Sequence, residues 1–196
     1  MHRIIQEKDV FNGSLQIKEG LIETETKQGK KESYSRERVC RPDAAAIFIF
    51  NEESQKVILT KQFRYAIAGR VESYLLEVVA GKVDPGELPH ETALRESEEE
   101  SGYRINPGNL HLLASCFASP GYTSEKYFLF YASVTNADKQ TSGGGLAEEN
   151  ESIETVEITY PEFTDLLNQG KLEDAKTLLA ALLLTTHKIF IKARTR

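Results

Sequence analysis

The sequence predicts an α+β protein in which helices flank a mixed central sheet and a small antiparallel sheet comes first. Three observations predict this class. Strongly apolar segments of strand length recur between residues 44 and 134, one helical segment interrupts them, and two more helical segments follow. With 196 residues and 40% hydrophobic side chains, the chain can bury a sizeable core. We therefore expect a globular protein rather than a disordered or fibrous one.

The first 42 residues alternate loosely between apolar and polar side chains, with turn-forming pairs at Asn12-Gly13 and Gln28-Gly29. This pattern predicts an antiparallel sheet that is too polar to bury much surface alone. We expect it to pack on the main domain or on a second subunit. The expected organisation is an N-terminal antiparallel β-subdomain, residues 1–42, followed by a main domain, residues 43–196.

Five apolar segments after residue 43 predict the core strands, because they are rich in β-branched and aromatic side chains. They are AAAIFIF (44–50), KVILTKQF (56–63), SYLLEVVA (73–80), LHLLASCFA (110–118) and KYFLFYASV (126–134). A glycine-rich stretch precedes LAEENESIETVEIT (146–159), whose second half alternates as a further strand.

Two helices should close the chain. One starts near Pro161, where proline suits the first helical turn. The other runs from about Glu173 to Lys192, and its apolar face is expected to hold Leu178, Leu179, Leu182 and Leu183.

The charge and cysteine content exclude several classes. Asp and Glu number 30 against 24 Lys and Arg, which gives a formal net charge of −6. Because non-specific nucleic-acid binding needs a basic surface, we expect no nucleic-acid partner. Cys40 and Cys116 have no partner at CxxC spacing, which favours reduced thiols in the cytoplasm over a long-range disulfide. The first residues lack a signal-peptide core, and the longest apolar run, Leu178–Leu184, is far below the ~20 residues that cross a bilayer, so we expect no membrane partner.

The segment from Gly81 to Tyr103 carries the strongest chemical signal. Asp84-Pro85-Gly86-Glu87 suits a type II turn, and a helix should follow from Pro89 and end at Gly102. The C-terminal half of this helix holds Glu96, Glu99 and Glu100, although like charges repel there and the helix dipole disfavours anions. A solvated acidic face is one interpretation. The other is a divalent cation site, because hard cations prefer several carboxylate oxygens.

The spacing of this segment resembles the signature box of the Nudix hydrolases. Gly81, Glu87, Arg95, Glu96, Glu99, Glu100 and Gly102 occupy its seven fixed positions. Ser97 and Tyr103 depart from the family, which usually has aliphatic residues there for packing the helix on the sheet.

Flanking motifs are similar to the nucleoside-diphosphate-sugar branch of that family. These are Gln62-Phe63-Arg64, Ser119-Pro120-Gly121 with Glu125, and Gly143-Gly144-Gly145 followed by residues 149–153. The resemblance implies an α/β/α sandwich and Mg²⁺-dependent hydrolysis of the pyrophosphate of a nucleotide sugar, with Mn²⁺ as an alternative metal. GDP-mannose is the favoured substrate and ADP-ribose the second.

The resemblance also implies roles for single residues. Glu96 and Glu100 would bind the metal with the carbonyl of Ala80, Glu99 would bind it directly or through water, and Glu151 would complete the cluster. Glu87 would pair with Arg95 to hold the loop and helix in register, between Gly81 and Gly102.

The general base must come from a loop outside the box. Glu149 and Glu151 are the first candidates, Glu125 is the third, and a merely polar loop is the alternative. Arg64, Arg41 and the weaker match Arg36 resemble arginines near the nucleotide, because guanidinium binds phosphate bidentately; ordinary ion pairs are the alternative. By resemblance the protein would be a homodimer that shares the nucleotide site.

The sequence leaves two rival functions open. A Nudix-like module could bind a nucleotide sugar without turnover, although such a protein would be expected to lose Glu96 or Glu100. An isoprenoid-diphosphate isomerase is disfavoured because the cysteines do not accompany the box.

Overall fold

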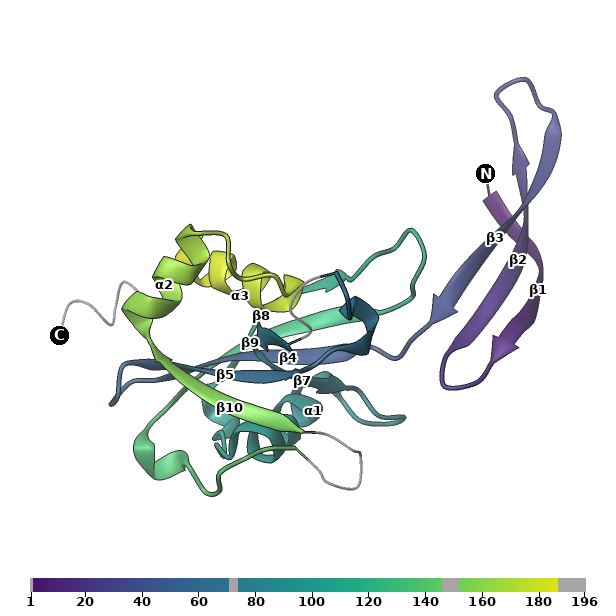
Figure 1. The fold of residues 1–196 in the computed structure, drawn as a ribbon. Helices are drawn as coiled ribbons and strands as arrows, with labels where there is room; N and C mark the ends of the chain where they lie inside the picture. Colours follow the sequence, from purple (N-terminus) through teal and green to yellow (C-terminus); the bar gives the residue numbers. More distant parts are fainter. Residues whose placement is uncertain (1, 71–73, 146–151, 187–196) are drawn as a thin grey trace. The chain divides into compact units, whose positions relative to one another are not determined.

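The computed structural model describes residues 2–70, 74–145 and 152–186 (Figure 1). The chain divides into two compact units, Met1–Asp43 with Cys116–Lys126, and Ala44–Ser115 with Tyr127–Arg196. The expected domain boundary after residue 42 stays a prediction, since the first unit also takes in a segment from the middle of the chain.

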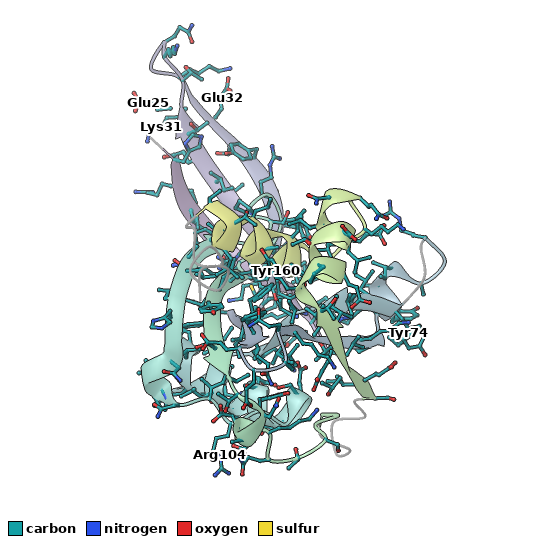
Figure 2. The ribbon with its side chains drawn as sticks, turned by 90° about the vertical axis from the view of Figure 1, so that its left-hand side faces the viewer. Glu25, Lys31, Glu32, Tyr74, Arg104 and Tyr160 are labelled. Carbon is teal, nitrogen blue, oxygen red and sulfur yellow. The ribbon has the colours of Figure 1, made fainter. Side chains whose placement is uncertain are left out.

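The first unit contains an antiparallel sheet with strand order β1-β2-β3. Its strands are β1 His2–Asn12, β2 Gln16–Glu25 and β3 Lys31–Cys40. Every residue of β1 is exposed, and the ion pairs Lys8–Glu19 and Lys18–Glu7 connect it to β2. Figure 2 shows charged side chains, including Lys31 and Glu32, around the β2–β3 turn. The predicted polar N-terminal sheet is therefore confirmed.

The second unit is built on a seven-stranded mixed sheet. Its main path is β10-β5-β4-β9-β8, with β6 paired to β5 and β7 paired to β4; β4 and β9 run parallel, while β4 is antiparallel to β5 and β7. The strands are β4 Ala44–Asn51, β5 Lys56–Phe63, β6 Tyr74–Glu77, β7 Val79–Lys82, β8 Leu110–Phe117, β9 Lys126–Val134 and β10 Ile153–Thr159.

Helices cover both faces of this sheet. In Figure 1, α2 and α3 lie on one face and α1 lies on the other. The helices are α1 Pro89–Glu96, the π-helical turn η2 Ser97–Ser101, α2 Tyr160–Asn168 and α3 Ala175–Thr186, with short 3₁₀ turns η1 Tyr65–Ile67, η3 Pro107–Asn109 and η4 Asn136–Asp138. The predicted α/β/α arrangement is confirmed.

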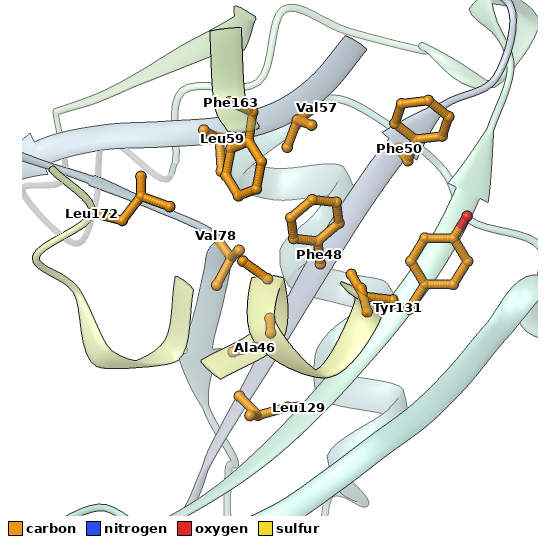
Figure 3. Close-up of a cluster of buried hydrophobic side chains, with 13 residues drawn as sticks. Ala46, Phe48, Phe50, Val57, Leu59, Val78, Leu129, Tyr131, Phe163 and Leu172 are labelled. Carbon is orange, nitrogen blue, oxygen red and sulfur yellow. The ribbon is translucent and has the colours of Figure 1, made fainter. Parts of the chain in front are cut away.

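The alternation along β4 explains the two layers of core. Ala46, Phe48 and Phe50 face the cluster shared with α2 and α3, shown in Figure 3, whereas the intervening residues face the cluster that includes Ala93 of α1. The ring of Phe48 lies 5.2 Å from that of Phe163 in an edge-to-face contact. Because both faces are covered, the whole strand is buried, and its residues 44–50 are continuously apolar.

Two predicted elements differ from the structure. The segment 73–80 forms two strands, because β6 pairs with β5 and β7 pairs with β4. Helix α3 buries Thr177, Ala180, Ala181 and Leu184, whereas Leu179 and Leu182 of the expected apolar face are exposed. Residues 187–192 of that expected helix lie outside the described residues. No helix in the described part of the chain is both long and apolar enough to span a bilayer.

Candidate active site

A tight turn connects β7 to α1 and sets the start of the site. The backbone N–H of Glu87 donates to the carbonyl of Asp84 at 3.0 Å, and Gly86 has φ +89°. This is the type II turn that the sequence predicts, since its third position requires a positive φ. The Glu91 carboxylate then accepts the N–H of Leu88 at 2.8 Å and caps the first turn of α1.

The helix continues past Glu96 as one turn of π-helix, which the sequence did not predict. The Ser97 hydroxyl donates to the carbonyl of Tyr103 at 2.8 Å, and the Ser101 hydroxyl donates to the carbonyl of Ser97 at 2.6 Å. The Ser101 hydroxyl thus satisfies a carbonyl of the turn itself, and the Ser97 hydroxyl ties the turn to the chain that follows Gly102. Gly102 ends the turn at φ +78°, and a Cβ there would overlap the carbonyl of Thr141.

The two departures from the family box thus have structural partners. Ser97 is fully buried, and its hydroxyl donates to the carbonyl of Tyr103. Tyr103 is buried in the core of the sheet, and its hydroxyl donates to Glu157 at 3.1 Å and accepts from Asn51 at 3.4 Å. Tyr103 packs in the core cluster that also holds Ala93 of α1, and both residues add buried hydrogen bonds.

Two carboxylates of the π turn region reach the backbone of β7. Glu100 is 2% exposed, and its Oε2 accepts the N–H of Ala80 at 3.1 Å. The Glu96 carboxylate lies against Gly81, where a Cβ would overlap it. Glycine is therefore required at position 81 by the approach of Glu96, and both carboxylates converge on the Ala80–Gly81 backbone.

Arg95 gathers the remaining acidic side chains. Its Nε and Nη2 donate to the two oxygens of Glu87, each at 3.1 Å, and its Nη1 donates to Glu96 at 2.7 Å and Glu99 at 2.9 Å. The hydrogen bond from Arg95 is the main cause that lowers the pKa of Glu87 to about 2. Desolvation opposes this shift, and a weaker contribution from the Thr92 hydrogen bond supports it. One cation thus holds three carboxylates.

The carboxylates around Ala80 and Gly81 are the candidate ligands for a metal ion. Within residues 2–70, 74–145 and 152–186, no three acidic, histidine or cysteine side chains form a preassembled metal cluster. Arg95 hydrogen-bonds two of the expected ligands, Glu96 and Glu99. The donor set of carboxylates and a neighbouring backbone carbonyl consists entirely of oxygen, which suits a hard divalent cation, and the missing side chain of Gly81 leaves room for Glu96.

The glycine triplet packs against the end of the π turn. The N–H of Gly144 donates to the carbonyl of Glu100 at 2.9 Å, and that of Gly145 donates to the carbonyl of Glu99 at 3.1 Å. On the other side, the N–H of Ile153 donates to the carbonyl of Gly144 at 3.4 Å. Glu149 and Glu151, the expected general bases, lie outside the described residues, and the residues flanking that segment are anchored beside Glu99 and Glu100.

Arg64 forms a two-point ion pair, which was the alternative interpretation of this residue, with a partner that the sequence did not identify. Its Nε and Nη2 donate to the two oxygens of Glu77 at 2.6 and 2.8 Å. Lys176 also contacts Glu77, at 3.2 Å, and Asp174, at 2.6 Å. The available signal was the charge of Glu77 inside the apolar run SYLLEVVA.

The other expected substrate residues belong to the first unit. Arg41 Nε lies 3.5 Å from the Glu125 carboxylate, so these two pair with each other. Arg36 stacks on the ring of Tyr34 at 4.7 Å. Arg36 also lines a cavity of about 510 Å³ together with Glu37, Arg38, Phe117 and residues 120–124.

Comparisons with known proteins agree with the sequence motifs. The NUDIX domain family matches residues 41–182. The GDP-mannose pyrophosphatase of Cronobacter sakazakii is 35% identical over 155 residues, 78% of each chain, and that of Pectobacterium atrosepticum is 36% identical over 146 residues, 74% of this chain and 73% of the relative. A crystal structure of an ADP compounds hydrolase matches with a TM-score of 0.72 at 24% identity, over 100% of this chain and 96% of that one, which shows the fold. The chain therefore belongs to the Nudix hydrolases.

Proposed function

We propose that the protein hydrolyses the pyrophosphate bond of a nucleoside diphosphate sugar to a nucleoside monophosphate and a sugar phosphate. GDP-mannose is the favoured substrate, since the similar proteins of Cronobacter and Pectobacterium are GDP-mannose pyrophosphatases. ADP-ribose is the second candidate. The observation that carries the proposal is the convergence of Glu96 and Glu100 on the Ala80–Gly81 backbone.

As a Nudix hydrolase the protein uses a divalent metal ion, and we propose Mg²⁺, with Mn²⁺ as the alternative. Glu96, Glu100 and the carbonyl of Ala80 would hold it, joined by Glu99 and by Glu151. When bound, such an ion neutralises phosphate charge and lowers the pKa of a water molecule. The hard oxygen donors and the space at Gly81 support this assignment.

Arg95 has a separate task in this proposal. Its two hydrogen bonds to Glu87 keep the turn and the helix in register, and they do not depend on whether Glu96 and Glu99 bind the metal ion. Its Nη1 hydrogen-bonds Glu96 and Glu99, which would otherwise repel each other. The arginine therefore stabilises an acidic site that would be strained without a cation.

The general base that removes a proton from the attacking water would be Glu149 or Glu151. Gly145 and Ile153 flank the segment that carries both residues and are tied to the end of the π turn. This attachment supports a base that acts next to Glu99 and Glu100. Glu125 is the third candidate, and it is a weaker one because Arg41 already engages its carboxylate at 3.5 Å.

Substrate recognition is assigned to arginines. Arg64 would contact the phosphates of the substrate, because a guanidinium with two donors engaged by Glu77 still has others to offer. Arg36 and Arg41, with Glu125, would contact the nucleotide. The cavity beside Arg36 has aromatic and basic lining residues, which supports this assignment.

We also propose a homodimer in the cytoplasm. The exposed apolar side chains of β1, Ile4, Val10 and Phe11 among them, would be covered by a second copy. Cys40 and Cys116 are free thiols, which suits a reducing compartment.

The test is a substrate panel. The protein is incubated with Mg²⁺ and GDP-mannose, ADP-ribose or a dinucleoside polyphosphate, and release of nucleoside monophosphate is followed. We expect turnover of a nucleotide sugar, fastest with GDP-mannose. Binding of these compounds without turnover of any of them would identify a binding module and contradict the proposal.

A further inference from the structure

A buried network of charges lies behind Arg64 in the second unit. We call Arg64, Glu77, Asp174 and Lys176 the buried network. Glu77 is 2% exposed and carries two cationic partners, the guanidinium of Arg64 and the ammonium of Lys176. Burying a carboxylate without partners is costly, so these contacts are a condition for placing Glu77 inside the protein.

The network is anchored to the start of α3. The Asp174 carboxylate accepts the N–H of Thr177 at 2.9 Å and its hydroxyl at 2.7 Å, and so caps the helix. The Thr177 hydroxyl in turn accepts the N–H of Val78 at 2.8 Å. The residue after Glu77 is therefore fixed to the helix that carries Lys176, which restricts the position of the Glu77 carboxylate.

Exposure increases along the network toward Arg64. The side chains of Glu77 and Asp174 are 2% and 9% exposed, that of Lys176 is 13% exposed, and that of Arg64 is 38% exposed. Burial alone would lower the pKa of Lys176, but the carboxylates of Asp174 and Glu77 outweigh it and raise this pKa. Lys176 is thus held as a cation beside Glu77.

Arg64 is the member of the network that can meet a ligand. Its Nε and Nη2 are engaged by Glu77, and among the described residues its Nη1 makes no hydrogen bond. Burial opposes a raised pKa of Arg64, but the hydrogen bond and charge of Glu77 outweigh it and raise this pKa. The charge of Glu100 adds to the increase. The Arg64 guanidinium is therefore within electrostatic range of Glu100, whose carboxylate accepts the N–H of Ala80.

We propose that Glu77 is a positioning residue that fixes the guanidinium of Arg64 for the phosphates of the substrate, and that Asp174 and Lys176 hold Glu77 in place for this task. A two-point ion pair leaves the guanidinium plane little rotational freedom, so Arg64 meets the substrate with less loss of side-chain entropy. The inference rests on the proposed function, because it assumes a phosphate ligand for Arg64.

The test is a double-mutant cycle of Glu77→Gln and Arg64→Ala, with KM and kcat measured for GDP-mannose. Glu77→Gln should raise KM about tenfold and change kcat by less than about threefold, because the lost contact contributes to substrate and transition state alike. In the Arg64→Ala background, Glu77→Gln should leave KM within about twofold, since Glu77 acts through Arg64. Unchanged KM in the single variant, or independent effects in the cycle, would overturn the proposal.

Glu157→Gln is the matched control for loss of a partly buried carboxylate. Glu157 pairs with Lys139 at 2.7 Å and accepts from Tyr103, so its loss should lower Tm and leave KM unchanged. A KM change in Glu157→Gln equal to that in Glu77→Gln would count against positioning. If Arg64→Ala does not fold, Arg64→Lys replaces it in the cycle, because lysine keeps the charge and loses the two-point geometry.

Calorimetric binding of GDP to the same variants separates this inference from the proposed function. A wild type that binds GDP without turnover would fail the proposed function, and the cycle would then be evaluated on Kd with the same expected ratios. A wild type with normal turnover and additive effects would overturn positioning alone. Absence of both turnover and GDP binding would overturn both.

Discussion

Two charged clusters of the second unit differ in their balance of charge. Arg95 pairs with three carboxylates, those of Glu87, Glu96 and Glu99, and the Glu100 carboxylate reaches the Ala80 backbone beside Glu96; we call these five residues the acidic cluster. The buried network pairs Arg64 and Lys176 with Glu77 and Asp174, so its charges cancel. The first cluster has a surplus that a divalent cation can neutralise, whereas the second is complete without an added ion.

The clusters also differ in how they are attached to the fold. The acidic cluster depends on one turn, one helix and the π turn that follows it, all within residues 81–102. The buried network joins residues 99 positions apart, since Lys176 of α3 contacts Glu77 of β6. Surplus charge in a local element suits ligand binding, and balanced charge between distant elements suits positioning.

The largest expected effect comes from the acidic cluster. Glu100→Gln should lower kcat by about a thousandfold, because a neutral amide is a poor ligand for a divalent cation. The amide oxygen can still accept the N–H of Ala80, so Tm should change by only a few degrees. Kinetics and thermal unfolding measure both quantities.

Glu98→Gln is the control for this variant. Glu98 lies in the same π turn but points to Arg104, with an N···O distance of 2.7 Å. Its variant should keep the wild-type kcat. A rate for Glu100→Gln close to that of Glu98→Gln would remove Glu100 from the proposed metal site.

Much of the fold could be predicted because its signals are local. The run AAAIFIF gave the central strand, since a strand covered on both faces has no polar positions. Pro85, Gly86 and Gly102 predicted the turn and the helix end, because each has a backbone preference that no distant residue alters. The residues of the acidic cluster were identified by a resemblance to the Nudix box, whose spacing also lies within one short segment.

The elements that were missed depend on tertiary contacts. The break at Val78 follows from different partner strands for β6 and β7 and from a hydrogen bond to Thr177. The buried face of α3 was wrong because LLAALLL is apolar all round, so periodicity does not select a face. Arg64 was expected near the nucleotide, yet its contacts with Glu77 could not be derived from sequence spacing.

Replacing a cationic side chain in each cluster tests whether only the acidic cluster needs an added cation, and we expect effects of intermediate size. Arg95→Met leaves carboxylates that repel one another, so we expect a Tm loss of several degrees in EDTA that Mg²⁺ largely restores. Lys176→Met leaves two buried carboxylates with fewer partners, and a cost of about 3 kcal/mol should persist with and without Mg²⁺. Thermal unfolding in EDTA and in Mg²⁺ measures both. Equal recovery of the two variants would contradict the distinction between the clusters.

The smallest effect concerns the pH dependence of the Glu87–Arg95 pair. The pKa of Glu87 is lowered from 4.5 to about 2, chiefly by the hydrogen bond from Arg95, so its ionised form is favoured in the folded state. The resulting stability is fully present above pH 4.5 and is lost as pH falls toward about 2, because the folded state then binds the proton that the unfolded state already holds. Glu87→Gln should therefore lower Tm at pH 7 by a few degrees, and this difference should shrink between pH 4.5 and 2.

Wild type and variant are compared by calorimetry across this range, with Glu91→Gln as the control for a capping glutamate of the same helix. A Tm difference for Glu87→Gln that stays constant down to pH 2 would mean that the pair contributes through packing rather than through charge.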